Sequence, residues 1–183
     1  KEAKRMDRNT QFSIAASKLA IEDAGIDLEK VDKRRAGVIV ATGIGGVSTM
    51  HDQYETLFAK GPNRISPFFV PMMIANMAAG QTSIQFGFQG PCLCIVTACT
   101  GGTNAIGEAT RKIQHGDADM MLAGGTEAAI SQAAVAGFCS MKAMSTRNDE
   151  PEKASRPFQS DRDGFVMGEG AGIMLLESLE HAV

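Results

Sequence analysis

Tryptophan is absent from this chain of 183 residues, and its aromatic residues are only nine phenylalanines and one tyrosine. So few rings do not suit a surface that stacks single-stranded nucleic acid. Excess positive charge is also lacking: the formal net charge is −3, so the general attraction to phosphate that dominates nucleic-acid binding is missing. No apolar run approaches the roughly 18 to 20 residues that cross a bilayer. The sequence therefore predicts neither a nucleic-acid-binding protein nor a membrane span.

Cysteine is scarce as well. The four cysteines, Cys92, Cys94, Cys99 and Cys139, are too few for a disulfide-stapled chain of this size, so we expect reduced thiols. Cys92 and Cys94 are two residues apart and would share one face of a strand, but without a second pair or a nearby histidine they do not make a zinc site. We predict both as small apolar core residues and expect no metal site.

Motifs for nucleotide binding and serine hydrolysis are missing too. Gly43-Ile-Gly45 lacks the third glycine that a dinucleotide fingerprint would place at position 48. Neither the Gly-x-x-x-x-Gly-Lys-Ser/Thr phosphate loop nor the Gly-x-Ser-x-Gly elbow occurs. An ordinary nucleotide-binding α/β domain is therefore a weak alternative.

The residues that are present alternate between short apolar runs and helical patterns. We expect helices at 9–24, 51–60, 72–86 and 100–115, strands at 36–42, 94–97, 119–123 and 171–177, and a polar loop at 145–162. In the first helix the predicted apolar face consists of Phe12, Ala15, Ala16, Leu19 and Ala20, with Gly25 as the C-terminal cap. This alternation predicts an α/β protein whose sheet is covered on both faces.

Cys99 stands between the expected strand 94–97 and the helix that follows it. A thiol at a helix N-terminus is stabilised as the thiolate by unsatisfied N–H groups and by the helix dipole, and its own N–H can face a developing oxyanion. A lone cysteine is more often a buried structural residue. The residues alone leave both interpretations open.

The segment Val96-Thr-Ala-Cys-Thr-Gly-Gly-Thr-Asn-Ala105 resembles the nucleophile segment of β-ketoacyl-[acyl-carrier-protein] synthases, the condensing enzymes of fatty-acid synthesis. The likeness spans nearly the whole chain and is strongest to the type II elongation enzymes. The other matching motifs, in chain order, are Met6-Asp-Arg8, Gly43-Ile-Gly-Gly46, Ile65-Ser-Pro-Phe-Phe-Val-Pro71, Gly116-Asp-Ala-Asp119, Ala123-Gly-Gly125, Ala143-Met-Ser-Thr-Arg-Asn-Asp149, Arg156-Pro-Phe158 and Arg162-Asp-Gly-Phe-Val-Met-Gly-Glu-Gly170.

The resemblance implies a thiolase-like fold, layered α/β/α/β/α and built from two similar halves. Residues 1–183 would form most of the first half, without its first strand and without the second half. The family's two catalytic histidines and a second oxyanion donor belong to that second half, so His51, His115 and His181 receive no catalytic role. Gln159 departs from the family's aspartate, a change in a loop that we expect to leave the chemistry intact.

The implied reaction is a decarboxylative Claisen condensation that needs no cofactor. An acyl group moves from an acyl carrier protein onto Cys99, and the carbanion from malonyl carrier protein then attacks it. The resemblance further implies a cytoplasmic homodimer. We expect the 183 residues by themselves not to complete the reaction.

The resemblance also implies two groups of binding residues. An acyl tunnel would be lined by Ile44, Phe138 and, across the two-fold axis of the homodimer, Phe69 and Val70. The alternative for these four is that they are plain core residues. A docking patch for the acidic carrier protein would comprise Lys1, Lys4, Arg5, Arg64 and Lys142. The alternative for residues 1–5 is a solvated entry to the first helix.

Three other functions share part of these sequence features. A catalytically silent partner, such as the chain-length factors of polyketide assembly, lacks the nucleophile, whereas this chain keeps Cys99. A polyketide ketosynthase shares the motifs and differs in pathway. Thiolases share the fold but use different flanking motifs and a second cysteine from the other half.

Overall fold

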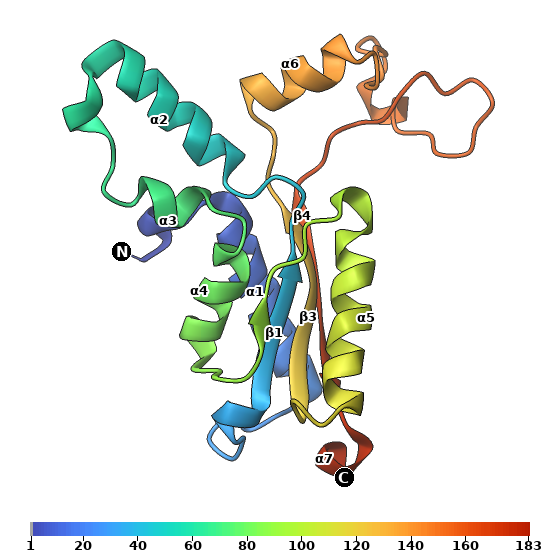
Figure 1. Cartoon of the computed structure of the whole chain (residues 1–183). Coiled ribbons are helices and arrows are strands. Elements are labelled where there is room, and N and C mark those ends of the chain that lie inside the picture. The colour runs from blue at the N-terminus through green and yellow to red at the C-terminus, as the bar shows by residue number, and fades with distance from the viewer. Residues whose placement is uncertain (1) are drawn as a thin grey trace.

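The computed structural model describes residues 2–183, and Lys1, one of the predicted docking residues, lies outside the described part. Its centre is a four-stranded sheet in the order β2-β1-β3-β4 (Figure 1). Strands β1 (Ala36–Ala41), β2 (Cys92–Leu93) and β3 (Met120–Glu127) are parallel, whereas β4 (Gly170–Glu177) runs antiparallel to β3. Strand β1 is fully buried, as its uninterrupted apolar sequence predicts for a parallel central strand.

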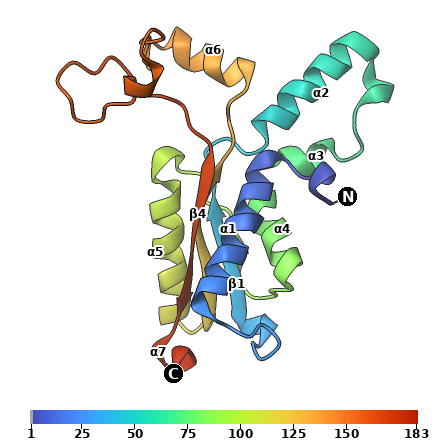
Figure 2. The same ribbon diagram turned by 180° about the vertical axis from the view of Figure 1, so that it is seen from behind.

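Helices cover both faces of the sheet, which confirms the α/β prediction (Figures 1 and 2). On one face, α1 (Arg8–Ala24) and α4 (Met77–Phe86) enclose a core with Val38, Val40 and Leu122. On the other, α5 (Gly101–Gln114) packs through Ala105 and Ala109 on the alternate residues of the same strands. Neighbouring strand residues point to opposite faces, so each strand serves both cores. Among residues 2–183, no helix combines the length and apolar character needed to span a membrane.

Helix α1 begins one residue before its predicted start and has the predicted Gly25 cap, with φ of 66°. The predicted apolar face was only partly right, since Phe12, Ala16 and Ala20 are half-buried but Ala15 and Leu19 are exposed. The buried residues of α1 include Ser13 and Ser17. The Ser13 hydroxyl lies 2.9 Å from Thr82 Oγ1 of α4. Small hydroxyl side chains let the two helices approach closely, and hydrogen bonds satisfy the Ser13 and Thr82 hydroxyls, whereas the buried Ser17 hydroxyl has no partner among the described residues.

The expected helix 72–86 is divided into α3 (Phe69–Met73) and α4. The Met73 carbonyl accepts the Gly46 N–H at 2.9 Å, a contact from outside the helix. A Cβ atom at Gly46 would lie 2.2 Å from the Met72 carbonyl oxygen, so only glycine permits this approach. Ile74 is extended, with ψ of 137°, and ends α3.

The expected strand 94–97 was misplaced, because the paired residues are Cys92 and Leu93. Beyond them the Ile95 carbonyl accepts the Thr42 N–H at 3.3 Å, and the chain then turns into a short 3₁₀ helix at Ala98–Thr100. Cys92 is exposed and Cys94 half-buried, so the prediction of core residues was wrong for Cys92.

Three helices stand at the carboxyl ends of β1 and β3, above the sheet in Figure 1: α2 (Val47–Lys60), α3 and α6 (Gln132–Ser140). Helix α2 begins four residues before its expected start, and α6 was not predicted. The apolar residues of α6 show no helical period against polar ones, although Ser131 provides a cap by accepting the Ala134 N–H at 3.3 Å. A last short helix, α7, covers Leu179–Ala182.

Candidate active site

Cys99 lies in a sharp turn at the entrance to α5. The 3₁₀ helix Ala98–Thr100 leads directly into Gly101, and Ala98 adopts a φ of 50°, which is costly for a residue with a Cβ atom. The Cys99 side chain is exposed. Within residues 2–183 its backbone N–H has no hydrogen-bond partner, so it is free to donate to a ligand. Such a strained turn before a helix is typical of a functional position.

Close packing at two glycines, Gly101 and Gly125, places this turn against the sheet. A Cβ atom at Gly101 would lie 2.9 Å from the Ala41 Cβ at the end of β1. A Cβ atom at Gly125 in β3 would lie 3.3 Å from the Gly102 Cα. The first turn of α5 therefore lies directly on the carboxyl ends of two parallel strands, the edge of an α/β sheet where ligands bind.

A cavity of about 520 Å³ opens at this edge. Its walls are mainly apolar side chains and exposed glycine backbone, as in pockets that take an apolar ligand. Three predicted site residues, Cys99, Ile44 and Phe138, line it together. The other lining residues include Ala41, Thr42, Gly43, Ala98, Gly102, Gly125, Glu127, Phe165, Met167 and Gly168.

Glu127 forms the polar part of the cavity wall. Its carboxylate accepts the Thr42 hydroxyl at 2.9 Å and the Gly43 N–H at 2.6 Å. Thr42 Oγ1 in turn accepts the Gly45 N–H at 3.1 Å. These bonds fix the turn that carries Ile44 into the cavity. The sequence predicted no role for Glu127, which is the last residue of β3.

Another part of the cavity wall is aromatic. The Phe138 ring of α6 meets the Phe165 ring edge to face, with centroids 5.1 Å apart. Phe165, Met167 and Gly168 were missed as lining residues. They belong to the motif Arg162–Gly170, which contributed to the resemblance but received no role at a site.

Phe69 and Val70 do not reach this cavity within the chain. They belong to α3, where the Phe69 ring contacts Tyr54 of α2 edge on at 6.5 Å and Val70 is 56% exposed. Neither is therefore a plain core residue buried inside the chain.

The predicted docking residues are divided between two places. The Arg5 guanidinium stacks over the Phe68 ring at 4.7 Å, beside α3, and Lys4 is its exposed neighbour. Arg64 ends a 3₁₀ helix four residues before Phe68. Lys142, with φ of 55°, lies just after α6 in the sequence. Helix α6 stands on the other side of the sheet's upper end from the N-terminus (Figures 1 and 2). The patch is therefore not continuous within one chain.

The remaining cysteines differ from Cys99 in their surroundings. Loss of solvation raises the pKa of both Cys92 and Cys94 above the ordinary thiol value, and the Cys94 thiol donates to the Ala75 carbonyl at 3.3 Å. Neither is in the cavity lining. Across residues 2–183, no group of three His, Cys, Asp or Glu side chains could hold a metal ion. None of the three histidines lines the cavity.

Comparisons with known proteins identify the family. The model of the N-terminal domain of β-ketoacyl synthases matches residues 1–182. The 3-oxoacyl-[acyl-carrier-protein] synthase 2 of Synechocystis sp. is 55% identical over all 183 residues, which correspond to 44% of that protein's length. The chain thus spans less than half the length of this curated relative.

Solved structures agree with the fold. A β-ketoacyl synthase from Burkholderia phymatum matches with a TM-score of 0.88 and 36% identity, over 97% of this chain and 44% of that one. A type II polyketide ketosynthase, solved in complex with its acyl-carrier protein, matches with a TM-score of 0.89 and 34% identity, over 96% of this chain and 44% of that one. These matches confirm the thiolase-like α/β fold. With the family model covering almost every residue, the chain belongs to the β-ketoacyl synthase family.

Proposed function

We propose that the chain is the N-terminal half of a 3-oxoacyl-[acyl-carrier-protein] synthase that extends acyl groups by two carbons. The Cys99 thiolate attacks the thioester carbonyl of an acyl carrier protein, forms a new thioester and releases the carrier's thiol. Malonyl carrier protein then loses carbon dioxide, and the resulting carbanion attacks the acyl-cysteine carbonyl. That attack forms the carbon–carbon bond and releases the cysteine thiolate.

The observation that carries the proposal is the position of Cys99. It is the only cysteine among the cavity's lining residues, it stands before α5, and its N–H is unpaired within residues 2–183. The unpaired N–H would donate to the oxyanion of each tetrahedral intermediate. One such donor typically contributes on the order of 100- to 1000-fold in rate.

The apolar cavity suits an acyl chain attached at Cys99. Ile44 and Phe138 lie on its walls, where a growing hydrocarbon would meet them. Phe69 and Val70, which lie outside this cavity, would enter the cavity of a second copy in a homodimer. This assignment is supported by the exposure of Val70 on α3 and by the aromatic cluster that the half-buried Phe69 forms with Tyr54 and Phe58.

Acyl carrier protein is the proposed partner, as in the complex of the polyketide ketosynthase relative. Lys4, Arg5, Arg64 and Lys142 would meet its acidic surface, and the two separate places where they lie would be joined by a dimer or by the rest of the synthase. The two catalytic histidines and the second oxyanion donor are proposed to come from chain outside residues 1–183.

Two alternatives are less well supported. A silent chain-length partner has no use for a nucleophile in a strained turn at a cavity, yet Cys99 occupies one. A polyketide ketosynthase would share all of these features. The 55% identity to a 3-oxoacyl-[acyl-carrier-protein] synthase 2, against 34% to the polyketide ketosynthase, favours fatty-acid extension.

The test is product formation by the full-length synthase that carries this chain. Purified protein is given an acyl carrier protein and malonyl carrier protein, and both the 3-oxoacyl product and carbon dioxide are measured. The wild type should form one of each per turnover, while Cys99→Ala should form no product. Product formation by Cys99→Ala would overturn the assignment of the nucleophile.

A further inference from the structure

We propose that Asp163 is a positioning residue that holds the Phe165 ring in the wall of the Cys99 cavity, so that a long acyl chain finds a fixed aromatic surface. This inference rests on the proposed function in the identity of the ligand. Asp163 belongs to a group of polar residues, here called the Asp163 cluster, that comprises Ser145, Thr146, Arg147, Asp161 and Asp163.

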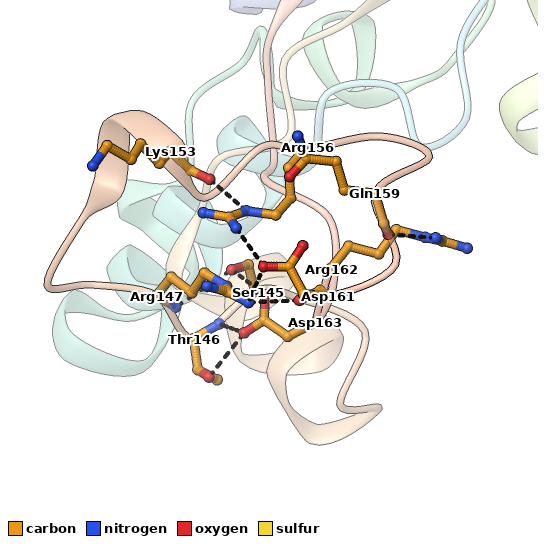
Figure 3. A network of polar contacts seen from close by, with 9 residues as sticks. All are labelled: Ser145, Thr146, Arg147, Lys153, Arg156, Gln159, Asp161, Arg162 and Asp163. Atoms are coloured by element: carbon orange, nitrogen blue, oxygen red, sulfur yellow. Dashed lines mark hydrogen bonds and ion pairs between the residues drawn. The ribbon is translucent and has the colours of Figure 1, made fainter.

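Asp163 connects two segments that are distant in sequence. One carboxylate oxygen accepts the Ser145 hydroxyl at 2.7 Å, and the other accepts the Thr146 N–H at 2.9 Å and the Thr146 hydroxyl at 3.2 Å. Figure 3 shows both residues beside the Asp163 side chain. Because three donors meet one carboxylate, the pKa of Asp163 falls from its usual 3.8 to about 2, and the group is ionised at neutral pH.

The residues next to Asp163 extend this connection to Phe165. The Phe165 N–H donates to the Ala143 carbonyl at 2.9 Å, and the Ser145 N–H donates to the Phe165 carbonyl at 2.9 Å. Gly164, which lies between Asp163 and Phe165 in the sequence, has φ of 156°, and a Cβ atom there would lie 2.3 Å from the Met144 carbonyl carbon. The backbone of Phe165 is thus held directly against residues 143–145.

Charged side chains in the loop 147–162 make further hydrogen bonds beside the Asp163 cluster. Arg147 donates to the Asp161 carbonyl at 2.5 Å, and Arg156 donates to the Asp161 carboxylate at 2.7 Å (Figure 3). Its guanidinium also donates to the Lys153 carbonyl at 2.8 Å. Residues 147 and 161, at the two ends of this loop, are therefore joined by a hydrogen bond, and Arg156 links its middle to Asp161.

Apolar packing does little to hold this region in place. Between residues 141 and 169, Ala154 alone is buried. The Phe165 ring is itself 40% exposed and makes its aromatic contact with Phe138. With so little buried apolar area, two sets of polar contacts fix residues 143–146 against Phe165: the backbone hydrogen bonds of Phe165 and the hydrogen bonds to Asp163. The aromatic wall depends on them.

The experiment compares Asp163→Asn with wild type in the full-length synthase. Asparagine keeps one acceptor oxygen but loses the charge and presents an amide to the Thr146 donors. Cys99 is alkylated with two reagents, iodoacetamide and an N-decyl iodoacetamide, and the two rates are measured by mass spectrometry of the Cys99 peptide. The matched control is Asp149→Asn, an exposed carboxylate in the same loop with no hydrogen bond among the described residues.

We expect Asp163→Asn to lower the ratio of decyl to small-reagent labelling roughly tenfold, since misplacing a positioning group by about 1 Å costs up to roughly a hundredfold. The iodoacetamide rate should stay within about twofold of wild type. Ser145→Ala, which removes one of the bonds to Asp163, should give an intermediate ratio, and Asp163→Glu should restore part of it. Asp149→Asn should match wild type.

An unchanged ratio in Asp163→Asn and Ser145→Ala would overturn the proposal. Equal slowing with both reagents would also overturn it, because that result indicates a general disturbance of Cys99. The proposed function is tested apart from this. If wild-type Cys99 were alkylated normally but took no acyl group from carrier protein, the function would fail while the ratio would still decide the role of Asp163.

Discussion

Glu127 accepts the Gly43 N–H at 2.6 Å, although the two residues are 84 positions apart in the sequence. The bond joins the ends of two neighbouring parallel strands, β1 and β3, at the cavity. Because the same carboxylate also binds Thr42, it fixes the turn that presents Ile44. The cavity is thus shaped by a polar contact that touches no reacting atom.

Replacing Glu127 by alanine should therefore destabilise the full-length protein by about 1 to 3 kcal/mol, the typical effect of losing hydrogen bonds to a partly buried charged group. Urea unfolding followed by circular dichroism measures this change. The control is Glu152→Ala, at an exposed position of the short 3₁₀ helix Pro151–Lys153, which should be within about 0.5 kcal/mol of wild type. Equal stability of the Glu127 and Glu152 variants would show that the contact does not hold the turn.

A larger side chain at Ile44 should shorten the acyl chain that the enzyme accepts. Ile44 lies on the cavity wall with Cys99, so the phenylalanine of Ile44→Phe would occupy volume that a long chain needs. We expect kcat/KM to fall at least tenfold for long acyl carriers and to stay near wild type for short ones. Ile74→Phe, at a half-exposed position outside the cavity lining, is the control. An unaltered chain-length profile would remove Ile44 from the acyl site.

Charge reversal should weaken carrier-protein docking. Arg5→Glu and Lys142→Glu should each raise the KM for acyl carrier protein and reduce its dependence on ionic strength, because charges at the rim of an interface mainly steer association. The two residues lie apart, so their effects should add. Lys30→Glu, at an exposed lysine 3.6 Å from Asp27, is the control. Wild-type kinetics at every salt concentration would exclude these residues from the docking surface.

The Asp163 cluster should respond to acid only well below neutral pH. Its carboxylate has a folded-state pKa of about 2 and an unfolded value near 3.8, so the stability it contributes is complete above pH 4 and is lost as the pH falls towards 2. A carbon-13 titration of the Asp163 carboxyl group checks this. A midpoint near 3.8 in the folded protein would mean that the hydrogen bonds to Ser145 and Thr146 are not formed in solution.

Hydrophobic periodicity predicted the fold class and most element positions, since strand β1 and helix α5 follow simple patterns. It failed where close packing replaced apolar burial. Ser13 and Ser17 are buried because small side chains permit contact between α1 and α4, and no apolar pattern marks such a face. The break after α3 is caused by the Gly46 N–H, which comes from a distant segment. Local sequence cannot contain that contact.

The site was only partly predictable from the sequence for the same reason. The strand-to-helix pattern made Cys99 a candidate but left a structural role open, and the family resemblance favoured the nucleophile. Ile44 and Phe138 came from the resemblance alone. Phe165 was missed because its role depends on the fold of the loop that follows α6, which brings its ring to Phe138. The separation of Arg5 from Lys142 was equally invisible, because a sequence gives no distance between two surface charges.

The central claim is that Cys99 carries the acyl group, and trapping the acyl-enzyme tests it most directly. Full-length protein is incubated with carrier protein loaded with an acyl group, in the absence of malonyl carrier protein. It is then digested at acidic pH to protect the thioester, and the peptides are mapped by mass spectrometry. The acyl mass should appear on the peptide containing Cys99, and Cys99→Ala should carry none. An acyl group on Cys92, Cys94 or Cys139, or an acylated Cys99→Ala protein, would contradict the account.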